Sequence, residues 1–272
     1  MITGNSPYDG GNLILKTEDK NELISNFPDS KSVIRPLYGT SNFINGEMQY
    51  CLWIRDEHLD LANSISPIFD RIEKVRTSRL SGGQVAKTLV SRAHQFRYTH
   101  VSETHSIIVP RHSSERREYI PFGLLNVNSI INDGALALYD AELWILSVLL
   151  SRIHMAWVRC IAGRIKIDLR YLSGLCYNTY PTPPLTAKNR RDLRICAENI
   201  LLARETHFPA TIADLYDPDE MPANLKEAHE QNDEVVERIY IGRRFKNDTE
   251  RLDKLFELYT KMTTTLNPGS SA

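Results

Sequence analysis

The 272-residue chain carries 33 Lys and Arg against 34 Asp and Glu, and 42% of its residues are hydrophobic. This length can bury a sizeable core and provides room for one large or two medium domains. The longest apolar stretch, residues 143–150, is too short to cross a bilayer, and no export signal starts the chain. We therefore expect a cytoplasmic protein without a membrane partner. Four widely spaced cysteines argue against a zinc ribbon or a disulfide framework.

The near-neutral total charge conceals a segregation along the chain. Residues 71–117 contain ten Lys and Arg but only three Asp and Glu, a net charge of +7. Such a basic block is a candidate footprint for a polyanion. A solvated basic loop without any partner is the alternative that the composition leaves open.

The first 80 residues begin with short strands and continue with a helical pattern. Residues 12–16 and 49–55 are expected to be strands, and Asn45-Gly46 between them is typical of a hairpin turn. Apolar residues then recur at helical spacing over 56–79, where Asp56 is a candidate N-cap and the Ser-Gly-Gly of 81–83 ends the helix.

The middle of the chain alternates strand and helix signals. Residues 106–110 and 119–122 are expected to be strands joined by a charged connection. Asn132-Asp133-Gly134 predicts a turn. Residues 140–162 are apolar over most of a helical circumference, which predicts one long and largely buried helix.

Residues 164–171 (RIKIDLRY) alternate strictly between charged and apolar side chains. The pattern predicts one strand with Ile165, Ile167 and Leu169 on its apolar face. On the charged face, Lys166 could donate to O6 and N7 of guanine, while Asp168 accepts from N4 of the paired cytosine. Arg170 could contact another guanine or a phosphate. The alternative is a solvated edge strand whose charges form cross-strand ion pairs.

Three prolines in 177–186 predict a linker, and three helices are expected beyond it, over 188–204, 222–240 and 249–263. The sequence thus predicts a mixed α/β domain of the α+β class over residues 1–182. A small all-α bundle over 183–272 follows it.

Asn5-Ser6-Pro7-Tyr8 differs by one residue from the Asn-Pro-Pro-Tyr signature of base-flipping amino-methyltransferases. Catalysis there would need a glycine-rich turn for S-adenosylmethionine, and none is recognisable in the sequence. We interpret the tetrapeptide as a turn, and we expect no catalytic residue, no metal site and no cofactor bound by this chain.

Several segments of the chain together carry a family resemblance. They are GNSPYDGGNLIL, TSNFINGEMQYCLWI, VPRHSSERREYIPFG, LLSRIHMAWVRCIAGRIKIDLRYLSGLCYNTYP and IADLYDPDEMPANLKEAHEQNDEVV, and the block HMAWVR…GR with YNTYP is the most specific part. These segments resemble the MmeI-like type IIL restriction–modification enzymes and their adenine-specific DNA methyltransferase relatives.

The resemblance implies that this chain corresponds to the target recognition domain and the helical C-terminal region. The methyltransferase core, with its S-adenosylmethionine, would then lie upstream in a longer parent protein, and Met1 would be an artificial start or that of a truncated gene. Double-stranded DNA and the parent's methyltransferase core are the implied partners. A nuclease in the parent remains an open possibility.

Family resemblance also implies base-specifying roles for Lys166, Asp168 and Arg170, with guanine on the strand that Lys166 approaches. Arg111 and Asp133 are the nearest counterparts of a second specifying region upstream. The basic block would contact phosphates, which position a protein on DNA without reading its sequence. Its candidates are Arg76, Arg79, Lys87, Arg92, Arg97, Arg116 and Arg117.

Two other classes of function remain as alternatives. The chain could be a catalytic domain in its own right, a nuclease or a permuted methyltransferase. It could also be a protein–protein adaptor similar to a specificity subunit, whose helical tail docks a partner.

Overall fold

The computed structural model describes residues 1–266. The chain forms two compact units. We call residues 2–108 and 124–140 the N-terminal unit, and Met1, residues 109–123 and the chain from Ala141 onward the C-terminal unit. The predicted domain boundary near residue 182 stays a prediction, because these units group the chain by spatial contact and not by position along it.

The N-terminal unit contains a sheet of order β2-β4-β3-β8, antiparallel except for its parallel β3–β8 pair. Buried side chains of these strands pack against helices α1, α3 and α4 to form its core. Further strands follow the order β1-β9-β5-β7. The bounds of these strands are β1 Ile2–Thr3, β2 Ile14–Leu15, β3 Ile34–Tyr38, β4 Tyr50–Leu52, β5 His105–Pro110, β7 Gly123–Asn126, β8 Ile130–Ile131 and β9 Ala135–Tyr139.

The helical segments of this unit are short. Their bounds are α1 Thr17–Asn26, α2 Thr40–Asn45, α3 Leu59–Ser64, α4 Ser66–Ser81 and α5 Gln84–Lys87, with 3-10 turns at Pro28–Val33, Asp56–His58 and Val90–Arg92.

Three details of the first 126 residues correct the sequence predictions. Asn45-Gly46 ends helix α2, with Gly46 in the left-handed conformation (φ 68°) that helix C-termini favour, and does not form a hairpin turn. The helix expected over 56–79 is interrupted at Ile65, because Pro67 fits only the first turn of a new helix, α4. Residues 119–122 are irregular, and strand β7 begins only at Gly123.

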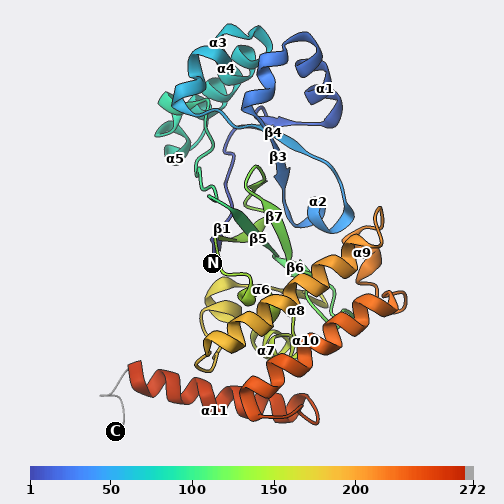
Figure 1. The fold of residues 1–272 in the computed structure, drawn as a ribbon. Coiled ribbons are helices and arrows are strands. Elements are labelled where there is room, and N and C mark those ends of the chain that lie inside the picture. Colours follow the sequence, from blue (N-terminus) through green and yellow to red (C-terminus); the bar gives the residue numbers. More distant parts are fainter. Residues whose placement is uncertain (267–272) are drawn as a thin grey trace. The chain divides into compact units, whose positions relative to one another are not determined.

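The C-terminal unit is dominated by helices, which Figure 1 shows in yellow to red. Helix α8 lies against both α6 and α10, and α11 lies against α7. The bounds are α6 Trp144–Leu149, α7 Arg152–Ile161, α8 Ala187–Glu205, α9 Ile212–Leu215, α10 Ala223–Ile241 and α11 Asp248–Leu266, with a π-turn at Ser173–Tyr177. The predicted class, an α+β part followed by a helical region, is confirmed.

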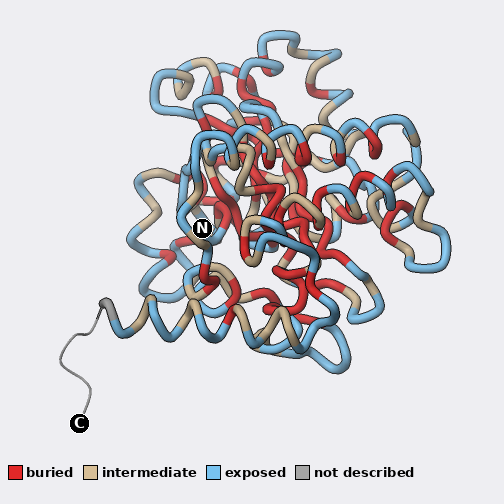
Figure 2. The backbone as a smooth tube through the Cα atoms, turned by 60° about the horizontal axis from the view of Figure 1, so that its bottom comes forward, coloured by how far each residue is buried: buried red, intermediate tan, exposed pale blue. Residues whose placement is uncertain are grey.

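The sequence predicts the three long helices of this unit correctly, but it does not predict the break between α6 and α7. Helices α8, α10 and α11 match the predicted ranges to within a few residues. The single helix expected over 140–162 is wrong, because α6 ends at Leu149 and α7 starts at Arg152, after the N-cap Ser151. In Figure 2, α11, which precedes the C-terminus, shows mostly exposed and intermediate residues, and within residues 248–264 only Leu255 is buried.

Candidate nucleic-acid interface

Residues 163–170 form a β-hairpin and not the single strand that the alternation predicted. Strand β10 (Gly163–Ile165) pairs antiparallel with β11 (Asp168–Arg170), and Ile165 lies opposite Asp168. Lys166 and Ile167 make the two-residue turn, in which Lys166 has a φ of +55°. Strict alternation cannot reveal such a turn, because its residues continue the alternating pattern of the strands.

The root of the hairpin is held by strand pairing and by the hydrogen bonds of Tyr171. Strand β11 pairs with β6 (His112–Ser113), and the N–H of Tyr171 donates to the carbonyl of Arg111 at 2.8 Å. The buried hydroxyl of Tyr171 lies 3.1 Å from Nε2 of His154 on α7. Burial lowers the pKa of the His154 imidazole to about 3, so this anchor is neutral.

Arg164 braces the turn itself. Its Nη1 donates to the carbonyl oxygen of Ile167 at 3.3 Å and forms an ion pair with Glu115 at 2.8 Å. Arg164 therefore links the turn to Glu115, which follows β6 in the chain. The side chains of the hairpin project from this braced backbone.

The expected division into an apolar and a charged face is only partly correct. Leu169 is buried, but Ile165 and Ile167 are 43% and 72% exposed. Lys166, Asp168 and Arg170 are all exposed, and neither Lys166 nor Arg170 forms an ion pair with any residue of 1–266. The charges that the sequence singled out are thus available to an outside partner.

Asp168 lies close to a basic segment of the same unit. Arg117 is half-buried, and burial lowers the pKa of its guanidinium while the carboxylates of Asp168 and Asp217 act in the opposite direction. The neighbouring Arg116 is exposed and forms an ion pair with Asp219 at 2.5 Å. These two arginines therefore have acidic neighbours already.

Arg79 corrects the expectation of a phosphate contact. Its side chain is 1% exposed, and it donates five hydrogen bonds of 2.7–3.2 Å to backbone carbonyls. The acceptors are the carbonyls of Pro7, Tyr8, Leu89, Arg92 and Gln95. With its donors occupied in the interior, this residue cannot reach a phosphate.

The other arginines of the N-terminal unit are partly engaged. Arg76 forms an ion pair with Glu73 at 3.1 Å, and Arg92 donates to the carbonyls of Phe96 and Arg97. The guanidinium of Arg97 lies over the rings of Tyr8 and Tyr98, with its carbon 5.7 and 4.8 Å from the ring centroids.

Lys87 differs from these arginines. It ends helix α5, is exposed, and forms no ion pair with any residue in the described part of the chain. It is therefore the predicted phosphate contact that the N-terminal unit leaves most accessible.

The second predicted specifying region is divided between the two units. Arg111 is partly buried and precedes β6 in the C-terminal unit. Asp133 is exposed in the β8–β9 turn of the N-terminal unit, where its N–H donates to the carbonyl of Asn5 at 3.1 Å. Both residues stay candidates for base contacts.

The opening tetrapeptide has a structural role. Asn5 is fully buried, and its side-chain amide pairs with the backbone of His100, donating at 2.8 Å and accepting at 2.7 Å. Asp9 accepts from the N–H groups of Gly11 and Leu13 at 2.9 and 2.6 Å. This arrangement is that of an anchored turn.

The sequence reasoning missed a buried polar network in the C-terminal unit. The Tyr119 hydroxyl donates to Asp233 at 2.7 Å, and Asp233 also accepts the backbone N–H of Arg152 at 2.7 Å. Burial raises the pKa of the Asp233 carboxyl to about 7, although these hydrogen bonds act to lower it. Separations of 81 and 114 residues along the chain leave no local signal for these contacts.

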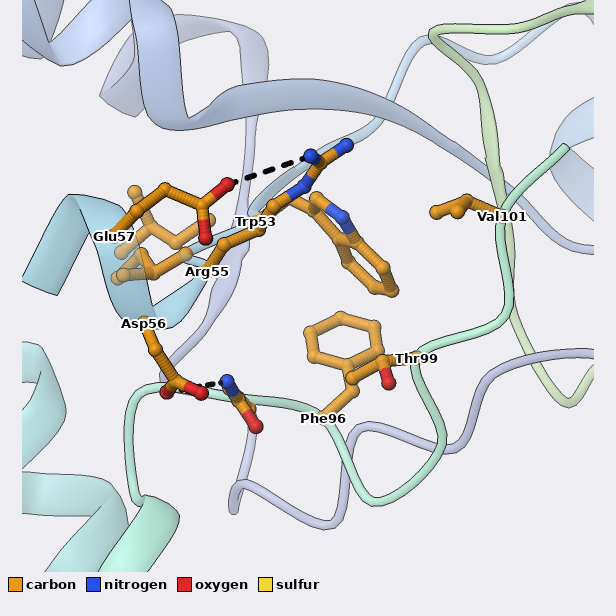
Figure 3. Close-up of a pocket in the computed structure, with 10 residues that line it drawn as sticks. Trp53, Arg55, Asp56, Glu57, Phe96, Thr99 and Val101 are labelled. Atoms are coloured by element: carbon orange, nitrogen blue, oxygen red, sulfur yellow. Dashed lines mark hydrogen bonds and ion pairs between the residues drawn. The ribbon is translucent and has the colours of Figure 1, made fainter. Parts of the chain in front are cut away.

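A pocket of about 200 Å³ lies in the N-terminal unit (Figure 3). The indole of Trp53 and the ring of Phe96 meet edge to face there, with centroids 5.5 Å apart, beside the Arg55–Glu57 ion pair. None of the predicted site residues lines it. Within residues 1–266, no three His, Cys, Asp or Glu side chains are placed to hold a metal ion. No helix in this range combines the length and apolar character needed to cross a membrane.

A braced hairpin with exposed charges, on an α+β part followed by helices, is the architecture of a recognition module. The chain belongs to the MmeI target recognition domain family, whose profile matches residues 1–184, and the profile of the MmeI C-terminal domain matches residues 185–267.

Two relatives of this chain are much longer than it is. DNA methyltransferase A of Bacillus subtilis (strain 168) is 39% identical over 261 residues, which cover 96% of this chain and 30% of that protein. The solved structure of the type IIL restriction-modification enzyme MmeI in complex with DNA matches with a TM-score of 0.90 and 32% identity. The match covers 97% of this chain and 35% of the MmeI chain. The chain therefore spans about a third of the length of these relatives.

Proposed function

We propose that this chain is the DNA target recognition module of a type IIL adenine-specific methyltransferase, and that it reads base edges in the major groove. The observation that carries the proposal is the hairpin of β10 and β11. A two-stranded ribbon fits the major groove, and this ribbon presents exposed Lys166, Asp168 and Arg170 from a braced turn. The MmeI match, which is a DNA complex, supports the same function.

The side-chain chemistry assigns roles within the hairpin. Lys166 donates to O6 and N7 of guanine, and Asp168 accepts from N4 of cytosine. Arg170 contacts a further base or a phosphate. Arg111 and Asp133 contribute to a second specifying region.

Phosphate contacts position the module without adding sequence specificity. Lys87 and Arg116 are the exposed candidates, and Arg76, Arg92, Arg97 and Arg117 are partly exposed ones. We propose further that the module works in the cytoplasm beside a methyltransferase core of the same parent chain, and that this core binds the S-adenosylmethionine.

Selection from a randomised duplex library with the 272-residue chain tests this function. We expect one enriched motif for the native chain. In the double variant Lys166→Glu/Asp168→Lys, we expect a changed base pair at one or two adjacent positions, because a well-made polar pair to a base is worth about 1–3 kcal/mol of discrimination.

A matched control is the swap Lys188→Asp/Asp192→Lys, which reverses an ion pair of 2.6 Å on helix α8. This control should select the same motif as the native chain. Failure of the native chain to enrich any motif would overturn the proposed function, whereas an unchanged motif in the hairpin variant would overturn the assigned roles.

A further inference from the structure

Ile167 is an isoleucine at the tip of a turn, where an apolar side chain gains nothing from the fold. It is 72% exposed, and among the large hydrophobic side chains described only Phe208, at 89%, is more exposed. Its neighbours Lys166 and Asp168 are charged and exposed, and its own exposure shows that no apolar cluster within residues 1–266 covers it.

The turn also runs against local backbone preference. Two-residue hairpin turns place Gly, Asn or Asp where φ is positive, but here Lys166 takes a φ of +55°. A residue that breaks a local rule without a gain inside the fold marks a functional position. The choice of Lys and then Ile at this turn therefore points to what the side chains meet outside the chain.

The position of Ile167 is fixed by its own backbone. Its carbonyl oxygen accepts from Nη1 of Arg164, and Arg164 is held in turn by Glu115. Ile165, 43% exposed, lies opposite Asp168 in the ladder and adds a second apolar group to the hairpin. The tip thus presents methyl groups at a defined place between a cationic and an anionic side chain.

We propose that Ile167 is a specificity-determining residue that contacts the C5-methyl group of a thymine. Among the edges of the four bases in the major groove, this methyl is the apolar group. Ile167 therefore selects an A·T pair adjacent to the pair that Lys166 and Asp168 read. The inference rests on the proposed DNA recognition and adds a base contact of a different chemical kind.

The test uses the duplex motif selected by the 272-residue chain, synthesised with each thymine replaced singly by uracil. This replacement removes one methyl group and keeps every hydrogen-bonding atom. At one position in or beside the pair read by the hairpin, we expect the affinity of the native chain to fall about fourfold, since burying one methyl-sized group is worth about 0.8 kcal/mol.

Three variants complete the test. Ile167→Ala should bind the thymine and uracil duplexes equally, and Ile167→Val should keep the preference for thymine. The control Ile195→Ala removes an isoleucine that is 49% exposed on helix α8 and should keep the full preference. Thermal unfolding of each variant checks that the fold is retained.

The outcomes separate this inference from the proposed function. A selected motif whose binding is indifferent to every uracil replacement would overturn the role of Ile167 and leave DNA recognition standing. A thymine preference that persists in Ile167→Ala would also overturn it, because another residue would then read the methyl. If the native chain selects no motif, both proposals fall together.

Discussion

Arg79 uses all of its hydrogen-bonding capacity inside the N-terminal unit. Its guanidinium ties helix α4 to the opening turn at Pro7 and Tyr8 and to the segment 89–95. A guanidinium presents five N–H donors in a rigid fork, which suits several carbonyls that converge from different segments. Its charge therefore contributes to the fold of the unit and not to its outer surface.

We expect Arg79→Met to destabilise the chain by about 3 kcal/mol, because five partly buried carbonyl oxygens lose the guanidinium as a donor. Urea unfolding followed by circular dichroism measures this change. The matched control Arg76→Met, which removes a partly exposed ion pair from the same helix, should cost less than about 1 kcal/mol. Equal losses in the two variants would contradict the structural role of Arg79.

The spacing of Lys166, Asp168 and Arg170 predicts that they face solvent, and the structure shows all three exposed. Their base-specifying roles stay a prediction. The same reasoning placed Ile165 and Ile167 on a buried face, because it treated two strands and a turn as one strand. It grouped Arg79 with the other arginines, because composition does not reveal which cation the fold encloses.

At the scale of elements, the break between α6 and α7 depends on residues of α10. Nδ1 of His229 lies 3.2 Å from the carbonyl oxygen of Leu150. Asp233 accepts a hydrogen bond from the backbone N–H of Arg152 at 2.7 Å. Ser151 caps α7 by accepting from the N–H of His154. The backbone groups that a helix break leaves unpaired therefore find partners.

The protonation of His229 follows from its contacts. Burial lowers the pKa of this imidazole well below its usual range, and the nearby Arg204 acts in the same direction. Neutral His229 donates from Nδ1 to Leu150 and accepts from the Tyr216 hydroxyl at Nε2, 2.7 Å away. The Tyr216 oxygen in turn accepts from Nε of Arg204 at 2.9 Å. Each polar atom in this series of hydrogen bonds therefore has a partner.

We expect His229→Phe to destabilise the chain by about 2–4 kcal/mol, because the Leu150 carbonyl and the Tyr216 hydroxyl both lose a buried partner. Chemical denaturation gives the free energy of unfolding. The control His207→Phe removes a partly exposed imidazole whose Nε2 is hydrogen-bonded to Asn224 and should cost less than about 1 kcal/mol. A loss below about 1 kcal/mol in His229→Phe would show that the helix break does not depend on this residue.

At the scale of the whole molecule, the basic block of the sequence is divided between the two units. Residues 71–108 belong to the N-terminal unit, and residues 109–117 belong to the C-terminal unit. The block also loses effective charge to internal contacts, since Arg79 is buried and Arg116 is paired with Asp219. The net charge of +7 therefore overstates what the block offers to a polyanion.

Lys87 allows the electrostatic part of recognition to be tested alone. We expect Lys87→Gln to weaken binding to all duplexes alike and to reduce the slope of log affinity against log salt concentration by about one. Binding titrations between low and physiological salt measure this slope. The control Lys226→Gln, an exposed lysine of helix α10 outside the block, should leave it unchanged. A weakening confined to one duplex sequence would show base reading instead of phosphate contact.

Local periodicity and charge patterns are enough to predict several features of this chain. These are the helices α8, α10 and α11, the position of the linker before them, and the exposed charges of 166–170. Local patterns suffice here because the residues of one helix face, or of one charged row, lie within a few positions of each other along the chain. Resemblance to the MmeI-like family came from motifs of the same short range.

Features whose partners lie far along the chain became visible only once the chain was folded. The helix break at Leu150 is completed by residues about 80 positions away, and Arg79 is enclosed by carbonyls that precede it by about 70 residues and follow it by 10–16. The hairpin turn at Lys166 and Ile167 is braced by Glu115 through Arg164. These three features follow from the requirement that buried polar groups find hydrogen-bond partners. The sequence does not show where in the chain those partners lie.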